Sequence, residues 1–194
     1  MSQKIDLRIQ RTRRNIQDAF IHLVTEHGFD ALTVQMMADQ AQINRATFYR
    51  HYIDKYDLAE QVGIALFEMA AQPHDDPFLQ IRHMFDCIAE YAPFYQAVMK
   101  TRTIPNFIEQ MFSRLEAGIE AHYVKMGFGG NKSKMPSALA FRYMATAQIG
   151  FVQWWIENEM PFSAAQAANY LLELHFHGPS WAIGIDNSFQ GSVS

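Results

Sequence analysis

The sequence has little cysteine and no long apolar run. Cys87 is the only cysteine in the 194 residues, which excludes an internal disulfide framework and a cysteine-rich zinc module. No apolar run approaches the roughly 20 residues that a membrane-spanning helix needs. The start, residues 1–14, is charged and lacks the apolar segment of a secretion signal. These absences predict a globular, cytoplasmic protein that does not bind a membrane.

Metal-binding and catalytic patterns are also scarce. His175 and His177 are separated by one residue, so on a helix their side chains diverge by about 200° and make a poor metal pair. Ser180 lacks the pattern of a hydrolase nucleophile. We therefore predict no metal site, no cofactor and no enzymatic activity.

Charge is unevenly distributed along the chain. The formal net charge is −4, which by itself disfavours a phosphate-rich partner. Up to residue 57, however, there are 8 basic and 7 acidic side chains, whereas the remainder has 8 basic and 13 acidic ones. The first fourteen residues hold five cations, Lys4, Arg8, Arg11, Arg13 and Arg14. This segment fits contact with a DNA backbone or minor groove, and it equally fits a solvated terminus.

The apolar spacing predicts helices and no strand. Ile16, Phe20, Leu23 and Val24 share one helical face, and Gly28 follows where a left-handed residue commonly ends a helix. Proline and glycine later divide the chain into long helical segments at about 106–126, 137–158 and 163–183. The predicted fold class is all-α, with a small N-terminal unit of about three helices and a larger helical body.

Two short helices with capping residues follow the first helix. Thr33 and Asn44 each precede a short helical pattern, and a side-chain oxygen at such a position accepts a hydrogen bond from the first helical turn. In the second helix, Phe48 and Tyr52 lie on one face and anchor it. This geometry predicts a helix-turn-helix whose second helix, about 44–51, enters the major groove of DNA.

The other face of this second helix is polar and cationic. Arg45 can donate two hydrogen bonds to a guanine edge, and Thr47 can meet a base or a thymine methyl. Tyr49, Arg50 and His51 are placed for phosphate or sugar, which fixes register without reading sequence.

A third helix start follows. Asp54 is a capping residue, with Asp57 three positions later. Lys55 sits at this start, where unpaired backbone amides favour an anion, so we expect it to complete a phosphate clamp.

“GFDALTVQMMADQAQINRATFYRHYIDKYDL” resembles the N-terminal DNA-binding signature of the TetR family of bacterial transcriptional regulators. The resemblance covers roughly residues 8–66, and “ATFYRHY-x-x-K-x-x-L” is among the more specific short signatures. It implies a DNA-binding domain at 1–57 and an effector-binding and dimerisation domain at 58–194. The family's typical DNA contacts fall on Thr33, Asn44, Arg45, Ala46, Thr47, Tyr49, His51 and Lys55.

One position departs from this family. Its members usually have glycine in the turn before the recognition helix, where this chain has Gln42. We expect Gln42 either to adopt a positive φ at some energetic cost or to alter the turn slightly.

The body resembles a subgroup of TetR-like ligand-binding domains, several of them from Firmicutes, through “PFYQAVM” and “GFVQWWIENEMPFSAAQAANYLLEL”. The resemblance implies a small-molecule effector and a homodimer formed through the segments at about 137–158 and 163–183. Adjacent Trp154 and Trp155 point about 100° apart on a helix, so we expect one in a core or pocket and the other toward a partner helix. Taken singly, each ligand candidate is more readily explained as ordinary core. The candidates are Tyr91, Phe94, Tyr95, Phe107, Met111, Tyr143, Phe151, Trp154 and Trp155.

The sequence therefore predicts a ligand-responsive transcriptional regulator, chiefly a repressor, that binds a near-palindromic double-stranded operator as a homodimer and is released by an effector. Activation stays open. The alternative is an architectural or partner-recruiting DNA-binding protein without a small-molecule effector.

Overall fold

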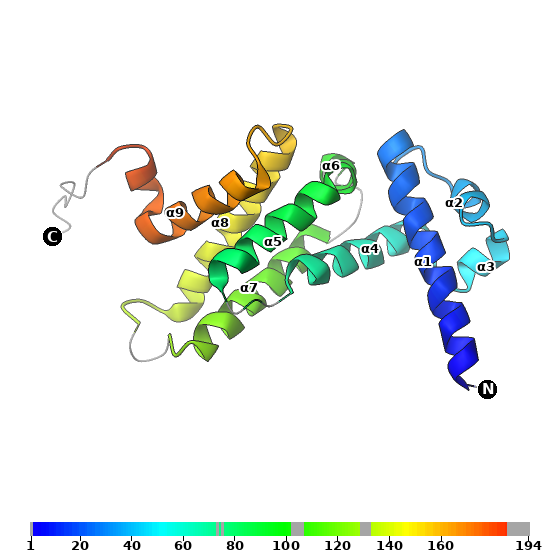
Figure 1. The fold of residues 1–194 in the computed structure, drawn as a ribbon, viewed down its shortest axis with the longest axis horizontal. Helices are drawn as coiled ribbons and strands as arrows, with labels where there is room; N and C mark the ends of the chain where they lie inside the picture. The colour runs from blue at the N-terminus through cyan, green and yellow to red at the C-terminus, as the bar shows by residue number, and fades with distance from the viewer. Residues whose placement is uncertain (1, 73, 75, 102–106, 129–132, 186–194) are drawn as a thin grey trace. The chain divides into compact units, whose positions relative to one another are not determined.

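The computed structural model describes residues 2–72, 74, 76–101, 107–128 and 133–185. Every regular element within these residues is an α-helix and none is a strand, which confirms the all-α class (Figure 1). None of these helices is both long and apolar enough to cross a lipid bilayer. In chain order they are α1 (Ser2–His27), α2 (Val34–Gln40), α3 (Arg45–Tyr49), α4 (Lys55–Ala70), α5 (Pro77–Glu90), α6 (Ala92–Thr101), α7 (Phe107–Lys125), α8 (Ser137–Glu157) and α9 (Ala164–Ala182).

The chain folds as two compact units. Unit 1 combines Met1–Met69 with Tyr91–Glu109, and unit 2 combines Ala70–Glu90 with Gln110–Ser194. Helix α6 therefore belongs to the same unit as α1, α2 and α3. The domain boundary expected at residue 57 falls inside α4, and it stays a prediction about how the functions are divided.

Unit 1 is built on the inward face of α1. The four apolar residues that the spacing assigned to this face are all buried. Phe20 of this set contacts Phe94 of α6 edge to face, with ring centroids 6.1 Å apart. Burial of large apolar side chains is the main stabilising contribution in such a core, and it holds α6 against α1.

Helix α1 ends where the sequence predicted. Gly28 has a φ of 76°, and its N–H donates to the carbonyl oxygen of Val24 at 3.0 Å. Glycine adopts this left-handed conformation readily because it has no Cβ. At its other end α1 begins at Ser2, so the backbone of the cationic N-terminal segment is helical.

Unit 2 has an aromatic core. The ring of Trp155 in α8 lies edge-on to Phe85 of α5, with centroids 5.2 Å apart, and its Nε1–H donates to the carbonyl oxygen of Phe162 at 2.9 Å. Phe151 contacts the rings of Phe85 and Phe162. Helix α9 packs against both α5 and α8. These aromatic rings therefore lie where the three helices α5, α8 and α9 meet.

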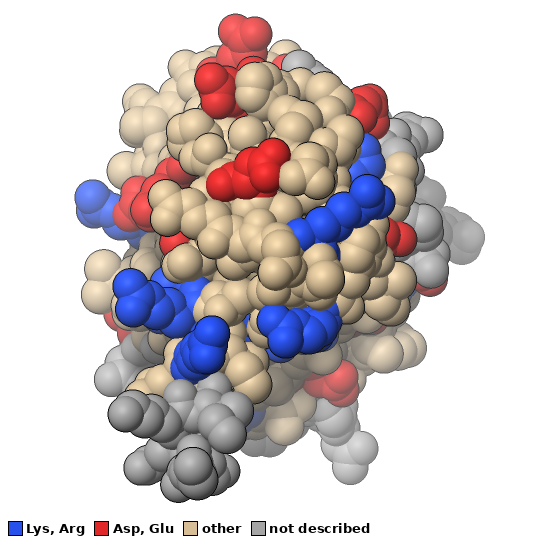
Figure 2. All heavy atoms as spheres, turned by 90° about the vertical axis from the view of Figure 1, so that its right-hand side faces the viewer, with Lys and Arg blue, Asp and Glu red and all other residues tan. Residues whose placement is uncertain are grey.

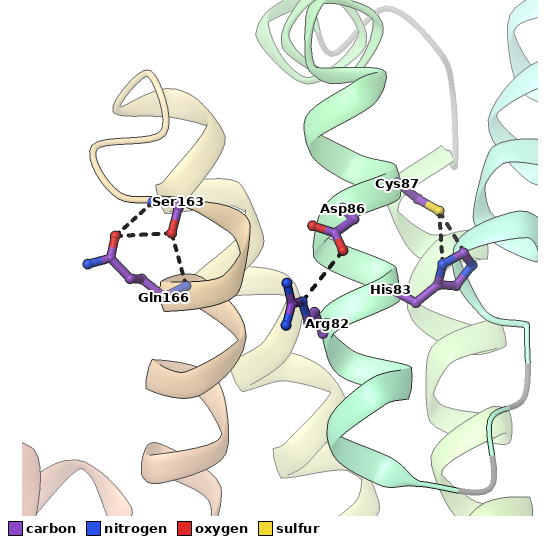
Figure 3. A network of polar contacts seen from close by, with 6 residues as sticks. All are labelled: Arg82, His83, Asp86, Cys87, Ser163 and Gln166. Atoms are coloured by element: carbon purple, nitrogen blue, oxygen red, sulfur yellow. Dashed lines mark hydrogen bonds and ion pairs between the residues drawn. The ribbon is translucent and has the colours of Figure 1, made fainter.

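The start of α9 is fixed by a reciprocal cap. The hydroxyl of Ser163 accepts a hydrogen bond from the Gln166 N–H at 3.3 Å, and Oε1 of Gln166 accepts one from the Ser163 N–H at 3.1 Å (Figure 3). This pairing satisfies two backbone donors that the helix leaves free. Helices α8 and α9 agree with the segments predicted at about 137–158 and 163–183.

Helix α9 is broken near its end, where the sequence predicted one regular helix. Gly178 has a φ of 80° and a ψ of 165°, and Pro179 follows it. Proline disfavours the helical conformation of the preceding residue and has no N–H to donate. The final turn is therefore set off from the rest, and its Trp181 contacts His177 across the break at 4.7 Å between ring centroids.

Candidate nucleic-acid interface

The two predicted caps of the helix-turn-helix are confirmed. The side-chain oxygen of Thr33 accepts a hydrogen bond from the Met36 N–H at 3.2 Å, at the start of α2. Asn44 Oδ1 accepts one from the Thr47 N–H at 2.7 Å, at the start of α3. Each cap satisfies a donor that the first helical turn cannot pair, so both short helices begin at a defined residue.

The turn between α2 and α3 has the conformation that glycine favours. Gln42 has a φ of 55°, so it adopts the positive φ that was the first of the two expectations. The turn therefore keeps the form that the resemblance implies. The N–H of Ile43 donates to the carbonyl oxygen of Ala38 at 2.9 Å and closes the turn. A left-handed conformation costs about 1–2 kcal/mol for a residue with a Cβ, so the turn holds strain that glycine would not.

Helix α3 separates buried aromatic residues from exposed polar ones. Phe48 is fully buried and Tyr52, just beyond the helix, is 2% exposed, as expected for the anchoring face. Their rings lie 5.7 Å apart. The regular helix covers Arg45–Tyr49, and the next turn continues through a bond from the His51 N–H to the Phe48 carbonyl at 2.9 Å. The predicted range of 44–51 thus contains a five-residue helix and its flanking turns.

The polar side chains of α3 and of Arg50, which follows it, hold one another in place. Arg45 donates a hydrogen bond to the Tyr49 hydroxyl at 3.1 Å, and its guanidinium lies 5.5 Å from the centre of the Tyr49 ring. Arg50 donates to Oγ1 of Thr47 at 3.0 Å. Each guanidinium has five N–H groups, so both arginines keep donors for a further acceptor. Less side-chain freedom is then lost when a ligand binds.

His51, a candidate for phosphate or sugar contact, is uncharged at neutral pH. Burial lowers its pKa from the usual value, and the nearby positive charges of Arg13 and Arg50 lower the pKa further. A neutral imidazole donates one hydrogen bond and accepts another. At neutral pH any contact of His51 with a phosphate oxygen would therefore use an N–H donor without full charge.

Lys55 does not extend freely from the surface. It is the first residue of α4, and its Nζ donates to the carbonyl oxygens of Phe29, Asp30 and Leu32 at 3.2, 3.2 and 3.1 Å. The phosphate contact expected for this residue stays a prediction. An ammonium group has only three N–H donors, so such a contact requires at least one of these bonds to be exchanged.

The start of α4 also agrees with the sequence. Asp54 Oδ1 accepts hydrogen bonds from the N–H groups of Tyr56 and Asp57 at 2.8 and 2.9 Å. Asp57 Oδ2 in turn accepts from the Ile53 N–H at 2.8 Å. Asp54 therefore caps the first turn of α4, and Asp57 reaches back to the backbone just before the cap.

Arg13, which the sequence grouped with the other N-terminal cations, has a structural role that the sequence did not indicate. Its guanidinium donates to Oε1 of Gln61 in α4 and lies 5.5 Å from the centre of the Tyr52 ring. Gln61 itself donates to Oδ1 of Asp57 at 2.7 Å. Arg13 thus joins α1 to α4 and to the residue that anchors α3. Its partners lie far along the chain, and no local pattern indicates them.

Cationic side chains are grouped on the face that carries α1, α2 and α3. Figure 2 looks at this side of the chain and shows several Lys and Arg side chains across its lower half, while most acidic side chains on it lie toward the top. The exposed arginines of unit 1 include Arg8, Arg11, Arg14, Arg45 and Arg50. A local cationic surface can bind phosphates even though the chain as a whole is acidic.

Cys87 is buried on α5 with its Sγ 3.5 Å from Nε2 of His83 (Figure 3). Burial raises the pKa of its thiol, and the charges of Glu90 and Asp86 raise that pKa further. The residue is therefore a weakly reactive thiol. Across the described part of the chain, no three His, Cys, Asp or Glu side chains are placed to hold a metal ion.

The ligand candidates are divided between the two units. Phe94 and Tyr95 are buried in unit 1, whereas Met111 and Trp155 are buried in unit 2. Trp154 is 50% exposed and Trp155 is 1% exposed, so the buried member of the pair is Trp155. The other candidates are Tyr91 and Phe151, which are half-buried, Tyr143, which is exposed, and Phe107, whose side chain lies outside the described residues.

Two sequence profiles match the chain. The profile described as “Bacterial regulatory proteins, tetR family” matches residues 16–62, and “Transcriptional regulator C-terminal region” matches residues 75–176, which is more than half of the chain. With the capped α2, turn and α3, these matches define a DNA-binding helix-turn-helix regulator of transcription. The chain belongs to the TetR family of bacterial transcriptional regulators.

Individual relatives agree with this assignment. Over 59 residues the chain is 36% identical to the uncharacterized HTH-type transcriptional regulator YxbF of Bacillus subtilis (strain 168); the match covers 30% of this chain and only 16% of YxbF. The TetR transcriptional regulator from Streptococcus agalactiae 2603V has a TM-score of 0.65 at 23% identity, over 90% of this chain and 99% of that one. FadR from Bacillus subtilis, solved in complex with stearoyl-CoA, has a TM-score of 0.61 at 18% identity, over 85% and 98%.

Proposed function

We propose that the chain is a ligand-responsive repressor that binds a near-palindromic operator as a homodimer and leaves it when a small-molecule effector binds. The observation that carries this proposal is the division of α3 between buried Phe48 on one side and exposed Arg45 with half-buried Thr47 on the other. A short helix anchored on one side and polar on the other is suited to lie in the major groove. The proposed activity is binding, and it requires no catalytic step.

The proposed DNA-contacting surface follows the start of α2 and the whole of α3. Arg45 is assigned to a guanine edge and Thr47 to a base or a thymine methyl. Phosphate and sugar contacts are assigned to the residues around them, because these fix the position of α3 without reading sequence. The proposed contacts are Thr33, Asn44, Arg45, Ala46, Thr47, Tyr49, Arg50, His51 and Lys55.

Apolar surface on α8 and α9 supports the homodimer. Monomeric proteins rarely expose large contiguous apolar patches, and such patches commonly mark a protein interface. A symmetric dimer would place two copies of α3 about 34–36 Å apart, which is one turn of DNA. The exposed side chains are Leu139, Tyr143 and Trp154 on α8 and Tyr170, Phe176 and Trp181 on α9.

A small-molecule effector is supported by the fold relative FadR, which was solved with stearoyl-CoA. Among the ligand candidates, Met111, Phe151 and Trp155 belong to unit 2, where an apolar ligand would meet aromatic surface. An effector that weakens operator binding must itself bind the operator complex more weakly, typically by about 1–3 kcal/mol.

Selection of bound genomic fragments with the purified chain tests the DNA-binding part of the proposal. The recovered fragments should share a near-palindromic site with half-sites about one helical turn apart. On that site Arg45→Ala should weaken binding by about 10-fold to 100-fold, because a bidentate contact to a base is worth about 1–3 kcal/mol. Fluorescence anisotropy with the selected duplex and with a scrambled duplex measures both affinities.

Arg82→Ala is the matched control for Arg45→Ala. Arg82 is an exposed arginine of α5 in unit 2, paired with Asp86 at 3.9 Å (Figure 3). The Arg82→Ala change should leave the affinities for the selected and the scrambled duplex unchanged. Equal losses on the selected and the scrambled duplex from Arg45→Ala would remove the base-reading role of this residue.

Thermal stabilisation tests the effector part. A ligand that binds only the folded chain raises its unfolding temperature by mass action. Acyl-CoA compounds of different chain length, with stearoyl-CoA among them, are the first panel to use. A compound that raises the unfolding temperature should also release the selected duplex. Stabilisation without release would contradict its role as an inducer.

A further inference from the structure

A single polar side chain interrupts the buried face of α8. Gln148 is 7% exposed, and within the described residues it is the only amide or charged side chain that is buried. The positions one and two helical turns away on this face are the buried residues Phe141, Ala145, Val152 and Trp155. Burial of an amide is unfavourable unless hydrogen bonds replace the water that it loses. The amide of Gln148 therefore needs partners that compensate its burial.

The hydrogen bonding of Gln148 does not meet this need. Its Nε2 donates to Sδ of Met84 in α5 at 2.9 Å, and a thioether sulfur is a weak acceptor. Across the part of the chain that the structure describes, the side chain has no other hydrogen bond, so Oε1 accepts none. Turning the amide over exchanges its two polar atoms and again leaves one with the sulfur and the other without a partner. Most buried polar side-chain atoms in folded proteins are paired, so this amide is an exception.

Helix α9 adds a second unsatisfied polar atom to the same unit. Nε2 of His175 is buried and has no hydrogen-bond partner among the described residues. His175 continues the buried stripe of Ala168, Leu171 and Leu172, and α9 packs against both α5 and α8. Because a short connection joins α8 to α9, the two helices run antiparallel. With a rise of about 1.5 Å per residue, Gln148 and His175 both lie about 15 Å along their helices from this connection, and so at a similar depth.

The side chain of Met84 is one that a ligand can displace. Methionine is unbranched, has three rotatable bonds and fills irregular space. When Met84 turns away, an oxygen or N–H group of a ligand can take the place of its sulfur against the Gln148 amide. The apolar part of such a ligand would meet aromatic rings, because Phe151 and Trp155, one and two turns from Gln148 on α8, contact Phe85 of α5. The weak contact between Gln148 and Met84 can thus be exchanged for a stronger one to a ligand.

We propose that Gln148 anchors the effector in unit 2 by hydrogen bonding, and that it binds an uncharged polar group, such as an amide, a hydroxyl or an ester carbonyl, on an otherwise apolar molecule. The inference rests on the proposed effector binding and gives the chemical class of the effector. A carboxylate is disfavoured at this position, because among the buried side chains that the structure describes none carries a charge to compensate it. His175 supplies a further hydrogen-bonding atom on α9.

Matched sets of compounds test this class on the unaltered chain. Each set keeps one apolar body, either a straight alkyl chain of eight, ten or twelve carbons or a naphthalene ring, and carries it as the amide, the alcohol or the carboxylate. Calorimetry at neutral pH measures each affinity. In the set whose body fits, the amide or the alcohol should bind at least about 10-fold more tightly than the carboxylate, because only the carboxylate loses the hydration of a full charge. Equal binding of the carboxylate, or no binding in any set, would overturn the proposal.

Gln148→Leu removes the polar atoms and keeps a similar volume. An amide bonded only to a thioether contributes little to folding, so the unfolding temperature should stay the same or rise. Affinity for the bound amide or alcohol should fall by about 10-fold or more, because its polar group is then buried without a partner. Gln153→Leu, the same change at a half-buried glutamine of α8 bonded to Glu157, is the matched control and should leave these affinities unchanged.

Stability separates this role from a structural one. Unchanged affinities in Gln148→Leu would overturn the proposal, and a loss of stability alongside them would identify a glutamine that serves the fold. Gln148→Met, which also lacks the amide, is the second variant should Gln148→Leu not fold, and failure of both to fold would likewise overturn the proposal. Binding that depends on Gln148 without release of the selected duplex would instead contradict the proposed repressor function and leave the assignment of Gln148 in place.

Discussion

In unit 1 the starts of α2, α3 and α4 are each held by a side chain of the preceding residue, whereas in unit 2 α8 begins at Pro136 without a side-chain cap. Unit 1 adds polar links between distant helices through Arg13 and Lys55. Unit 2 depends more on burial of large aromatic rings around Trp155. Most of the exposed large apolar side chains also belong to unit 2.

The difference follows from helix length. Short helices such as α2 and α3 bury few side chains, so caps and turns must fix their ends. A long helix such as α8 buries enough apolar surface to begin without a side-chain cap, and in α9 the cap at Ser163 adds to this packing. Unit 1 is therefore expected to respond most to the loss of specific hydrogen bonds, and unit 2 to the loss of packing.

Trp155→Ala is the strongest test of the packing in unit 2. Removing a buried tryptophan should lower the free energy of unfolding by about 3–5 kcal/mol, because it leaves a cavity beside Phe85 and Phe162. Urea unfolding followed by circular dichroism measures the loss. The adjacent Trp154→Ala removes the same ring from a half-exposed position, and its loss should be smaller by about 2 kcal/mol or more. Equal losses would contradict the assignment of Trp155 as the core residue.

Asn44→Ala tests the dependence of unit 1 on capping. Losing this cap should cost about 1 kcal/mol in the free energy of unfolding, measured in urea. Operator affinity should fall as well, since α3 has only five residues and loses its defined start. Asn44→Ser keeps a capping oxygen and should restore most of the stability. The corresponding change in unit 2, Ser163→Ala, should cost a similar free energy and leave operator affinity unchanged.

Gln42→Gly should make unit 1 more stable, whereas the two changes above lower the stability of the chain. Glycine relieves the left-handed strain at φ 55°, and the greater freedom of glycine in the unfolded chain offsets part of the gain. The free energy of unfolding should rise by about 1 kcal/mol or less. Gln40→Gly, at the helical end of α2, should lower it instead. A loss of stability from Gln42→Gly would show that the Gln42 side chain contributes contacts that outweigh the strain.

His175 gives unit 2 a pH dependence. Burial lowers the pKa of His175, and its Nε2 has no hydrogen-bond partner. The unfolded chain therefore binds a proton at higher pH than the folded chain does, so stability should fall as the pH falls through about 6.5 and below. His175→Gln should reduce this dependence in urea titrations at several pH values. His177→Gln, two residues along α9 at an exposed position paired with Glu173, should keep it. An unchanged pH profile in His175→Gln would remove this assignment.

The features that the sequence predicted are local ones. The caps at Thr33 and Asn44 and the end of α1 at Gly28 each depend on a residue and its neighbours within one helical turn. The divergence of Trp154 and Trp155 follows from helical geometry in the same way. Features that depend only on neighbouring residues can be predicted without knowing the tertiary fold.

The features that the sequence missed depend on the tertiary fold or on competing local signals. Lys55 bonds to carbonyls 23–26 residues away, and Arg13 bonds to a residue 48 positions away. No periodicity encodes such pairs. The break in α9 had a signal in Pro179, but the apolar pattern continues through it and predicted one helix. The ligand candidates were chosen by residue type alone, which does not tell which compact unit contains a side chain.

The separation of roles along α3 has a consequence for how this protein can change. Phe48 and Tyr52 supply its burial, whereas Arg45 is exposed and Thr47 half-buried, so substitutions at Arg45 and Thr47 disturb less packing than changes at the two aromatic residues do. If these two residues read the operator as proposed, new operator preferences can arise one residue at a time, with few compensating changes elsewhere in the chain. The same property would then make these two positions suitable for redirecting the regulator to a chosen promoter in the laboratory.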